Sequence, residues 1–507
     1  MKKMSAWNPV AARRAPGEGV GEIVRRATVA AVCLGGSVCL GLTESELDRM
    51  PWGEKLELIR GTTTDDPVEP DYEPSFGPLP REIGRVQIDT AWAGHPTGFA
   101  LVTTAERQYA AYYNGERRMV VAARDLGSTE WDYAALPTYI GWDSHNYIRM
   151  ALDRDGRLHL SGNLHNDPLI YFRTREPHAI GTFEAIHRMT GEDESGVTYP
   201  RFFEDADGRL IFTYRQGSSG SGFNVYNRYD TESGEWERLH DQPLLDGRGE
   251  MNAYPIGPLQ GPDGVFHMTW VWRDTPDAAT NHDLSYARSR DLVHWETAAG
   301  EPVALPLTLE TPGLILDPIP VNGGILNGSG RIGFDHEGRV IVTYFKFDEE
   351  GKTQIYNARL VDGEWDIRQA TDWDYRWEFG GGGSLPNPQV RHAEVKAGED
   401  GLILAVRHPV YPGGVFRVDE DSLKLGERVP PSPQRRRLEA RIGEVRGEFP
   451  GLEVRKHRFP GPPGSGLSYV LRNETLPQNR DRPRPEPWPE PSPLELITIL
   501  ENEPEER

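Results

Sequence analysis

The chain is poor in cysteine. Among its 507 residues there are only Cys33 and Cys39, and both lie in one apolar stretch, residues 27–42. No residue after position 39 can therefore take part in a disulfide or a thiolate zinc site. That stretch is short for a membrane-spanning helix, and we expect no membrane span in the mature chain.

Positive charge is also scarce. The chain has 56 Lys and Arg against 78 Asp and Glu, which gives a net charge of −22. This balance argues against a nucleic-acid-binding surface and gives no reason to expect binding to anionic membranes. An acidic polysaccharide remains a possible partner, because a few local Arg and His side chains can hold a carboxylate inside an acidic protein.

The N-terminal part of the chain has the pattern of an export signal. Arg25 and Arg26 precede the apolar stretch, as in a secretion signal. We therefore predict a signal segment at 1–45 and a secreted or periplasmic protein. A twin-arginine signal and a small buried helix are alternatives, and a lipid anchor on either cysteine is a minor one because the preceding residues match a lipobox poorly. A linker at 46–83, a catalytic domain at 84–500 and a tail at 501–507 follow.

A turn of the D-x-D-G type followed by an alternating strand recurs along the catalytic domain. It appears at 153–162, 204–215, 261–270, 335–345 and 398–408, with an earlier relative at 114–124. Between these units lie short segments that end in Trp after a turn, predicted as outer strands, at Trp131, Trp236, Trp295 and Trp365. Such spacing is typical of four-stranded propeller blades with loop insertions. We predict an all-β fold, a β-propeller of about seven four-stranded blades.

Two further elements bear on this prediction. The strand predicted at Leu494–Leu500 could pair with an N-terminal strand near Arg85–Asp89 and close the ring. Amphipathic helices are scarce, and Leu438–Val445 is the best short candidate. A β-helix or a pair of sandwiches is the alternative architecture.

Three histidines lie in one predicted hairpin, at 145, 159 and 165. His145 precedes the first strand, Tyr147–Leu152, and His165 follows the second, so both can face one pocket at the mouth of a propeller. His159 alternates with Leu158 and Leu160 within the second strand, which favours a packing or solvent-facing role. The hypothesis that His145 and His165 are functional competes with an ordinary structural role.

The next unit repeats this geometry. Tyr199 opens its first strand and Arg215 ends its second, so they occupy positions equivalent to those of the two histidines. In the third unit Tyr254 lies at the entry, and Arg273, Asn281 and His282 lie in or near the loop, which makes them candidates for substrate binding.

These residue types favour elimination over hydrolysis. Glycosidases usually need two carboxylates, and Asp143 has no evident partner. A lyase acting on a uronic acid needs a group that neutralises the carboxylate, a base for the C5 proton and an acid for the leaving oxygen. Arg215 suits the carboxylate, and Tyr can serve as base and acid when cations lower its pKa.

At family level the sequence resembles the BNR-4 repeat proteins. The segments WDSHNY, HLSGNLH, TYPRF, YRQGSSG, MNAY and TWVWRDTPDAATNHDLSYARS carry this resemblance, which covers most of residues 84–500. These proteins are similar to seven-bladed propeller polysaccharide lyases, including ulvan lyases and rhamnose–glucuronate lyases.

The resemblance implies that His145 and Tyr199 transfer protons while Arg215 and His165 handle the carboxylate. The neighbouring Asn146, together with Tyr254, is expected to contact substrate. No cofactor is expected for the chemistry. Some relatives hold a structural zinc with Cys and His; here such a site is absent or rebuilt from histidines such as His282, His336 or His408, and a structural zinc or calcium ion stays open.

Two alternatives remain at this stage. One is a sialidase-like propeller hydrolase, for which Arg215 and Arg273 supply only part of the usual arginine cluster. The other is a carbohydrate-binding propeller without turnover. An acidic polysaccharide or oligosaccharide is the expected partner in the favoured hypothesis.

Overall fold

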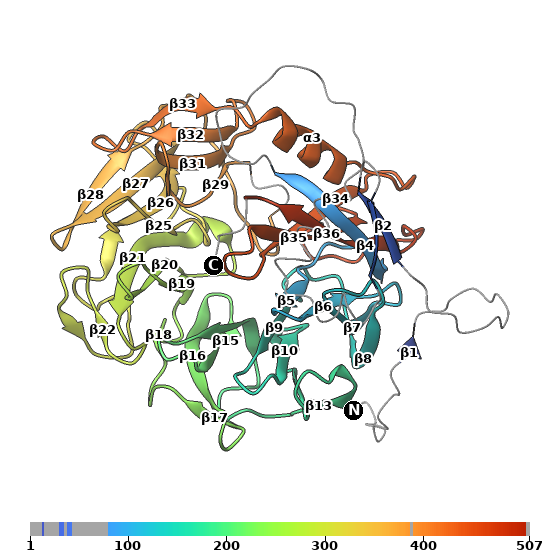
Figure 1. Ribbon diagram of the computed structural model, residues 1–507. Helices are drawn as coiled ribbons and strands as arrows, with labels where there is room; N and C mark the ends of the chain where they lie inside the picture. Colours follow the sequence, from blue (N-terminus) through green and yellow to red (C-terminus); the bar gives the residue numbers. More distant parts are fainter. Residues whose placement is uncertain (1–12, 15–29, 35–37, 43–79, 386–388, 503–507) are drawn as a thin grey trace.

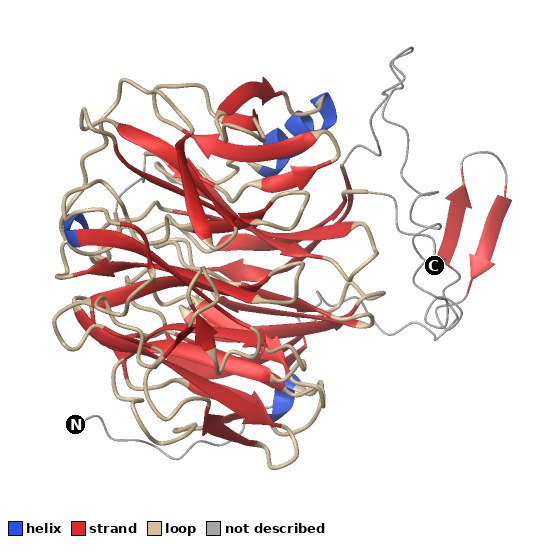
Figure 2. Cartoon of the chain, turned by 90° about the vertical axis from the view of Figure 1, so that its left-hand side faces the viewer, coloured by secondary structure: helices blue, strands red, loops and turns tan. Residues whose placement is uncertain are grey.

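A computed structural model of the protein describes residues 13–14, 30–34, 38–42, 80–385 and 389–502. Successive antiparallel sheets form a ring (Figure 1), and the side view shows strands throughout with very little helix (Figure 2). The fold is the all-β propeller predicted from the sequence.

The strands group into four-stranded meanders in chain order. The first three are β5–β8 (Ala100–Thr103, Arg107–Tyr113, Arg118–Asp125, Asp132–Tyr139), then β9, β10, β12 and β13 (Ile148–Leu152, Leu158–Gly162, Tyr171–Thr174, Phe183–Ala185), then β14–β17 (Val197–Glu204, Leu210–Ser218, Ser221–Asp230, Glu235–Arg238). Next come β19–β22 (Asn252–Gln260, Phe266–Arg273, Asn281–Ser289, Trp295–Glu296), β25–β28 (Arg331–Phe334, Val340–Phe347, Thr353–Val361, Glu364–Gln369) and β30–β33 (Lys396–Gly398, Gly401–Arg407, Gly414–Val418, Leu425–Val429). In Figure 1, β5, β9 and β19 lie toward the middle and β8, β13, β17 and β22 at the rim.

Several short elements lie outside these four-stranded meanders. They are β1 (Arg13–Arg14), β11 (His165–Asp167), β18 (Leu245–Asp246), β23 (Pro302–Val303), β24 (Ile315–Asp317), β29 (Arg391–His392), and the 3-10 helices Ile180–Thr182 and Ala278–Thr280. In the N-terminal region β2 (Ala30–Leu34) pairs with β3 (Val38–Leu42). The rest of the predicted signal segment and most of the predicted linker lie outside the described residues.

The recurring Asp and Gly of the sequence repeat have a local structural cause. The side chains of Asp153, Asp205 and Asp335 each accept backbone N–H groups from the residues two and four positions later. The turn that results needs a left-handed residue, and Gly156 (φ 79°) and Gly338 (φ 77°) supply it. These turns join the first and second strands of the blades, which explains the repeat.

The tryptophans of the predicted outer strands lie at the beginning of those strands. Trp236, Trp295 and Trp365 are among the first two residues of β17, β22 and β28, and Trp131 directly precedes β8. The prediction that each outer strand ends at its Trp was therefore wrong: the turn comes first, and the strand begins at or next to the Trp. His159 is fully buried and contacts the Tyr171 hydroxyl at 2.7 Å, which makes it a packing residue.

The ring closes by pairing the two ends of the domain. The last meander combines β34 (Glu453–Pro460), β35 (Leu467–Thr475) and β36 (Ser492–Leu500) with β4 (Arg81–Ala91). In this pairing Leu494 lies opposite Asp89 and Ile497 opposite Arg85, as predicted. Helix α3 (Pro433–Ile442) packs on this sheet; it begins earlier than predicted, with Ser432 as its N-cap, and ends before Gly443.

Closure should make β36 a determinant of stability. Leu496 is fully buried in the cluster that joins the last and first meanders. We expect Leu496→Ala to lower the free energy of unfolding by about 2–5 kcal/mol, the usual cost of a large-to-small core change. Urea denaturation measures this, with the exposed Leu259→Ala as control. Equal stability of the two variants would contradict a structural role for the closure.

Candidate active site

Two histidines share one carboxylate at the mouth of the ring. Nδ1 of His145 lies 2.6 Å from Oδ1 of Asp143, and Nδ1 of His165 contacts the other oxygen, Oδ2. The two imidazole rings stack with centroids 4.1 Å apart. A nitrogen this close to a carboxylate oxygen carries the proton, so Nε2 of each ring is the free position. No group among the described residues bonds to either Nε2.

Asp143 is held in its ionised form. Burial by itself would raise the pKa of Asp143, but the hydrogen bonds from His145 and His165 outweigh it and hold the pKa well below its usual range. One possible ligand atom from each of the three side chains lies within 4.8 Å of the other two, a spacing that a divalent metal ion could use. Two ligands of one zinc ion lie about 3 Å or more apart, so the 2.6 Å contact indicates a hydrogen bond.

A second carboxylate, missed by the sequence analysis, approaches from the last meander. Asp481 Oδ1 accepts the backbone N–H and the hydroxyl of Ser144 at 3.0 and 2.8 Å, and Oδ2 accepts the N–H of Ser384 at 2.7 Å. Oδ2 also lies 3.6 Å from Nδ1 of His145, and Oδ1 lies 3.7 Å from Nε2 of the buried His95. No local motif marks Asp481, because its partners are about 100 and 340 residues away in the chain.

Asp481 should therefore stabilise the mouth in a pH-dependent way. Burial opposes its ionisation, but His95 and the two N–H donors outweigh that effect and hold the pKa of Asp481 well below its usual range. A lowered folded-state pKa contributes stability above the unfolded pKa, about 4, and this stability is lost as pH falls below it. We expect Asp481→Asn to cost about 2 kcal/mol at pH 7 and to flatten the acid limb of thermal stability measured from pH 2 to 7. An unchanged acid limb would contradict this.

Tyr199 enters the mouth through a strained backbone. Its φ is +59°, which is rare for an aromatic residue, and the pairing of β14 with β15 shifts register between Thr198 and Arg201. Such bulges re-aim side chains and cluster at functional sites. The Tyr199 ring lies 5.7 Å from that of His145. Among the described residues, no hydrogen bond holds its hydroxyl.

Arg215 lies beneath Tyr199. Its Cζ is 4.9 Å from the centroid of the Tyr199 ring, and its guanidinium donates to the Tyr254 hydroxyl at 3.4 Å and to Thr198 Oγ1 at 3.1 Å. Arg215 is only 1% exposed and has no carboxylate partner within the described part of the chain. A second cation, Arg273, lies 5.6 Å from the Tyr254 ring centroid.

These neighbours have opposite effects on Tyr199. Burial raises the pKa of Tyr199 above its usual range and Tyr254 adds to the increase, whereas Arg215 and Arg273 lower it by less. Tyr199 is therefore a neutral phenol that can donate a proton. The same cations would stabilise the phenolate that donation leaves behind.

The structure brings together most, but not all, of the residues predicted for the site. His145, His165, Tyr199, Arg215, Tyr254 and Arg273 form one connected group. Asn281 does not join this group. Its side chain is fully buried, and its amide donates to Ala278 O at 2.6 Å, so it stabilises the turn at Ala278–Thr280. His282 contacts Asp274 at 2.9 Å and Asp283 at 2.8 Å. Asn146 is 9% exposed, and its backbone carbonyl accepts the Tyr113 hydroxyl.

The histidines considered for a structural metal do not come together. His336 contacts Gly398 O at 2.8 Å, and Nδ1 of His408 accepts the N–H groups of Val410 and Tyr411. Between residues 80 and 502, apart from 386–388, Asp143, His145 and His165 are the only such group with metal-ligand spacing. His282, His336 and His408, the three candidate metal ligands, thus each make separate local contacts.

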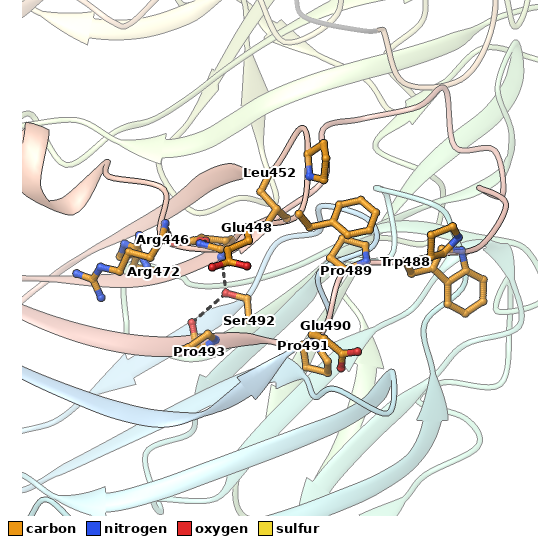
Figure 3. A pocket seen from close by; sticks show the side chains of 15 residues that line it. Arg446, Glu448, Leu452, Arg472, Trp488, Pro489, Glu490, Pro491, Ser492 and Pro493 are labelled. Carbon is orange, nitrogen blue, oxygen red and sulfur yellow. Dashed lines mark hydrogen bonds and ion pairs between the residues drawn. The ribbon is translucent and has the colours of Figure 1, made fainter.

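A pocket of about 650 Å³ lies at the mouth-side end of the last meander (Figure 3). Its lining includes Phe449, Leu452 and the Pro487–Pro493 segment with Trp488. It contains none of the four residues predicted to be catalytic. The ring of Trp488 lies 5.4 Å from that of Trp142, the neighbour of Asp143, so the pocket borders the candidate site.

The match to a known family agrees with this arrangement. Residues 107–373, slightly more than half of the chain, match the model of the BNR repeat-containing family. The chain belongs to the BNR repeat-containing family. In this member, the matched region includes every residue of the connected group at the mouth, while Asp481 lies outside it.

Similar proteins include ulvan lyases. The short isoform from Alteromonas sp. (strain LOR) is 27% identical over 148 residues, which cover 26% of this chain and 27% of the relative. The long isoform from the same strain is 43% identical over 135 residues, 24% of this chain and 13% of the relative. The matched segments thus span about a quarter of one relative and an eighth of the other.

Solved structures extend the likeness over most of the chain. The polysaccharide lyase Uly1 aligns with a TM-score of 0.53 at 15% identity, covering 82% of this chain and 92% of that one. A PL25 ulvan lyase aligns with a TM-score of 0.51 at 13% identity, covering 83% and 96%. At these identities the likeness establishes the shared fold. No helix among the described residues has the length and apolar character needed to cross a membrane.

Proposed function

We propose that this protein is a polysaccharide lyase that cleaves the bond next to a uronic acid by β-elimination. An ulvan-like or rhamnose–glucuronate glycan is the proposed substrate. The observation that carries the proposal is the pairing of a neutral Tyr199 hydroxyl with an oriented imidazole, His145, above a buried and unpaired guanidinium. The ulvan lyase relatives support the substrate class, and the basic flank of residues 27–42 supports export to the periplasm or medium.

His145 is the proposed base. Its Nδ1–H donates to Asp143, so its Nε2 lone pair faces away from the carboxylate and can accept the C5 proton of the uronate. The Asp143 carboxylate stabilises the imidazolium that forms, as a buried Asp does for the histidine of a catalytic triad. Proton removal leaves negative charge delocalised onto the uronate carboxylate.

Tyr199 is the proposed acid. Its hydroxyl proton passes to the glycosidic oxygen as the C4–O bond breaks, and the product is a 4,5-unsaturated uronate. The phenolate that remains lies against Arg215, with Arg273 nearby. His145 then returns its proton through solvent, and Tyr199 is reprotonated, which completes the cycle.

Arg215 and His165 are the proposed partners of the substrate carboxylate. A buried guanidinium without a carboxylate partner is costly, and an anion at the mouth offsets that cost. Nε2 of His165 faces the same space as that of His145, since the rings are stacked. Neutralising the carboxylate lowers the barrier to forming the enolate-like intermediate.

The two carboxylates of the site favour a lyase over a hydrolase. A glycosidase needs one carboxyl group with a raised pKa as its general acid. The pKa values of Asp143 and Asp481 are both well below their usual range, and the oxygens of both are occupied by donors from the protein. Neither carboxyl group can therefore act as the acid of a hydrolytic mechanism.

Ultraviolet absorbance of the unsaturated product tests the proposal. The purified protein is incubated with a panel of uronate polysaccharides, including ulvan and glucuronate-bearing gum side chains. A rise in absorbance with new reducing ends is expected. Reducing ends without unsaturation would indicate hydrolysis, and binding without either product would indicate a non-catalytic propeller; each result would overturn the proposal.

A further inference from the structure

Five arginines lie on strands from the inner part of several blades. Arg149, Arg331, Arg391 and Arg455 lie on β9, β25, β29 and β34, and Arg407 ends β31. Figure 1 shows β9, β25 and β29 toward the middle of the ring, and β34 is the strand of the last meander farthest from β4; the four strands come from four different meanders. We call these five side chains the axial arginines.

The axial arginines lack the ion pairs that other arginines of this acidic chain make. Arg339, Arg417 and Arg458, for example, each have a carboxylate oxygen within 3.5 Å. Across residues 80–385 and 389–502, none of the axial arginines forms a salt bridge or a side-chain hydrogen bond to another residue. Two acidic residues lie near them: Glu453 is close to Arg455, and Glu394, close to Arg331, pairs with Lys396 at 3.0 Å.

Like charges are also placed directly opposite one another. Arg391 and Arg407 are cross-strand partners in the β29–β31 pairing, a position where like charges destabilise a sheet. Nε of Arg455 is buried without a hydrogen-bond partner in the described part of the chain. Burial lowers the pKa of Arg391, and Arg407 and Arg455 lower it further, as expected of a group crowded by cations.

The group is continuous with the candidate active site. Cζ of Arg149 lies 4.4 Å from the ring centroid of Tyr147, two residues after His145. On β34, burial lowers the pKa of His457 to about 4, with Arg455 and Arg149 adding to the decrease. Positive charge thus extends from the segment that carries His145 toward β34 and β29.

We infer that the axial arginines form a second anion-binding site, which holds a further acidic group of the glycan whose uronate is at Tyr199. This inference rests on the proposed function for the identity of the glycan. The shared ligand chemistry is a carboxylate or a sulfate ester. In the free protein the unpaired cations repel one another, and a bound polyanion relieves that repulsion. The same positive charge attracts the polyanion to a molecule that is otherwise acidic.

A charge-matched pair of variants tests the inference. Arg391→Gln/Arg455→Gln removes the charge of two axial arginines and leaves shorter polar side chains. Arg417→Gln/Arg458→Gln removes two arginines that pair with Glu427 and Glu439 instead. Both double variants are made in the Tyr199→Phe background, so that binding of an ulvan octasaccharide can be measured by calorimetry without turnover.

The axial variant should bind the octasaccharide about tenfold more weakly, equivalent to about 1.4 kcal/mol, and the matched control less than twofold more weakly. Its affinity should also depend less on salt concentration, because fewer charges take part. Equal affinity of the axial variant and the control would overturn the inference. Thermal melting excludes misfolding, since removing repelling charges should leave the melting temperature unchanged or higher.

Modified oligosaccharides identify the anionic group. If the site holds sulfate, chemical desulfation should weaken binding and abolish the difference between the axial variant and the control. If it holds carboxylate, that difference should survive desulfation and disappear after carboxyl reduction. A protein that binds in this arginine-dependent way but produces no unsaturated uronate would refute the proposed lyase activity and leave the anion site supported.

Discussion

Replacing Tyr199 by Phe should lower kcat for elimination by about 10³-fold, since general acid catalysis contributes typically 10²–10⁴-fold. The change removes only the hydroxyl that donates to the leaving oxygen, and the ring keeps its place above Arg215. No hydrogen bond within the described residues holds this hydroxyl, so the free energy of unfolding should change by less than about 0.5 kcal/mol. Initial rates from product absorbance and urea denaturation measure the two effects.

The matched control is Tyr214→Phe. Tyr214 is the buried neighbour of Arg215 on β15, and its hydroxyl accepts a hydrogen bond from Arg238 at 3.4 Å. This variant should lose stability and keep its kcat. Full activity of Tyr199→Phe would show that another group protonates the leaving oxygen. A loss of activity caused by unfolding would be accompanied by a lower stability in the denaturation curves.

Replacing Asp143 by Asn should have the second large effect, a fall in kcat of about 10²–10⁴-fold by analogy with the loss of the carboxylate in a catalytic triad. An amide oxygen can accept from only one imidazole, and its NH₂ group must face the other. One of the two rings is therefore forced to place its proton on Nε2. If that ring is His145, the lone pair needed for C5 proton abstraction is lost.

A positioning role for Asp143 can be separated from a merely structural one. Asp153 lies 3.3 Å from Nε2 of the buried His159, so Asp153→Asn changes an Asp–His pair that takes no part in the proposed proton transfers. It should lower stability and leave kcat and its pH profile unchanged. Asp143→Asn should instead change the shape of the pH profile of kcat/KM, and its effect on KM should be smaller. Identical profiles for Asp143→Asn and wild type would contradict the assignment.

The fold was largely predictable from local patterns. The Asp and Gly of each turn shape a segment of only five residues, since one carboxylate accepts two nearby N–H groups. The alternation of each strand follows from burial of one of its faces. The closing strand was also predictable, because a ring without it would leave an unpaired edge. The helix boundary was predicted less well, as Ser432 and Gly443 fixed α3 through caps outside the apolar pattern.

By itself, the sequence determined the propeller, the approach of His145 to His165 and that of Tyr199 to Arg215, because these pairs lie at equivalent ends of hairpins whose register is local. Only the tertiary structure decided that Asp143 bridges both imidazoles, that Asp481 supports them from the last meander, and that Asn281 is buried in its turn. Only it gathered the axial arginines, which come from strands as far apart as β9 and β34. Contacts of this kind depend on how distant blades are placed around the ring, and no short-range spacing in a sequence encodes them.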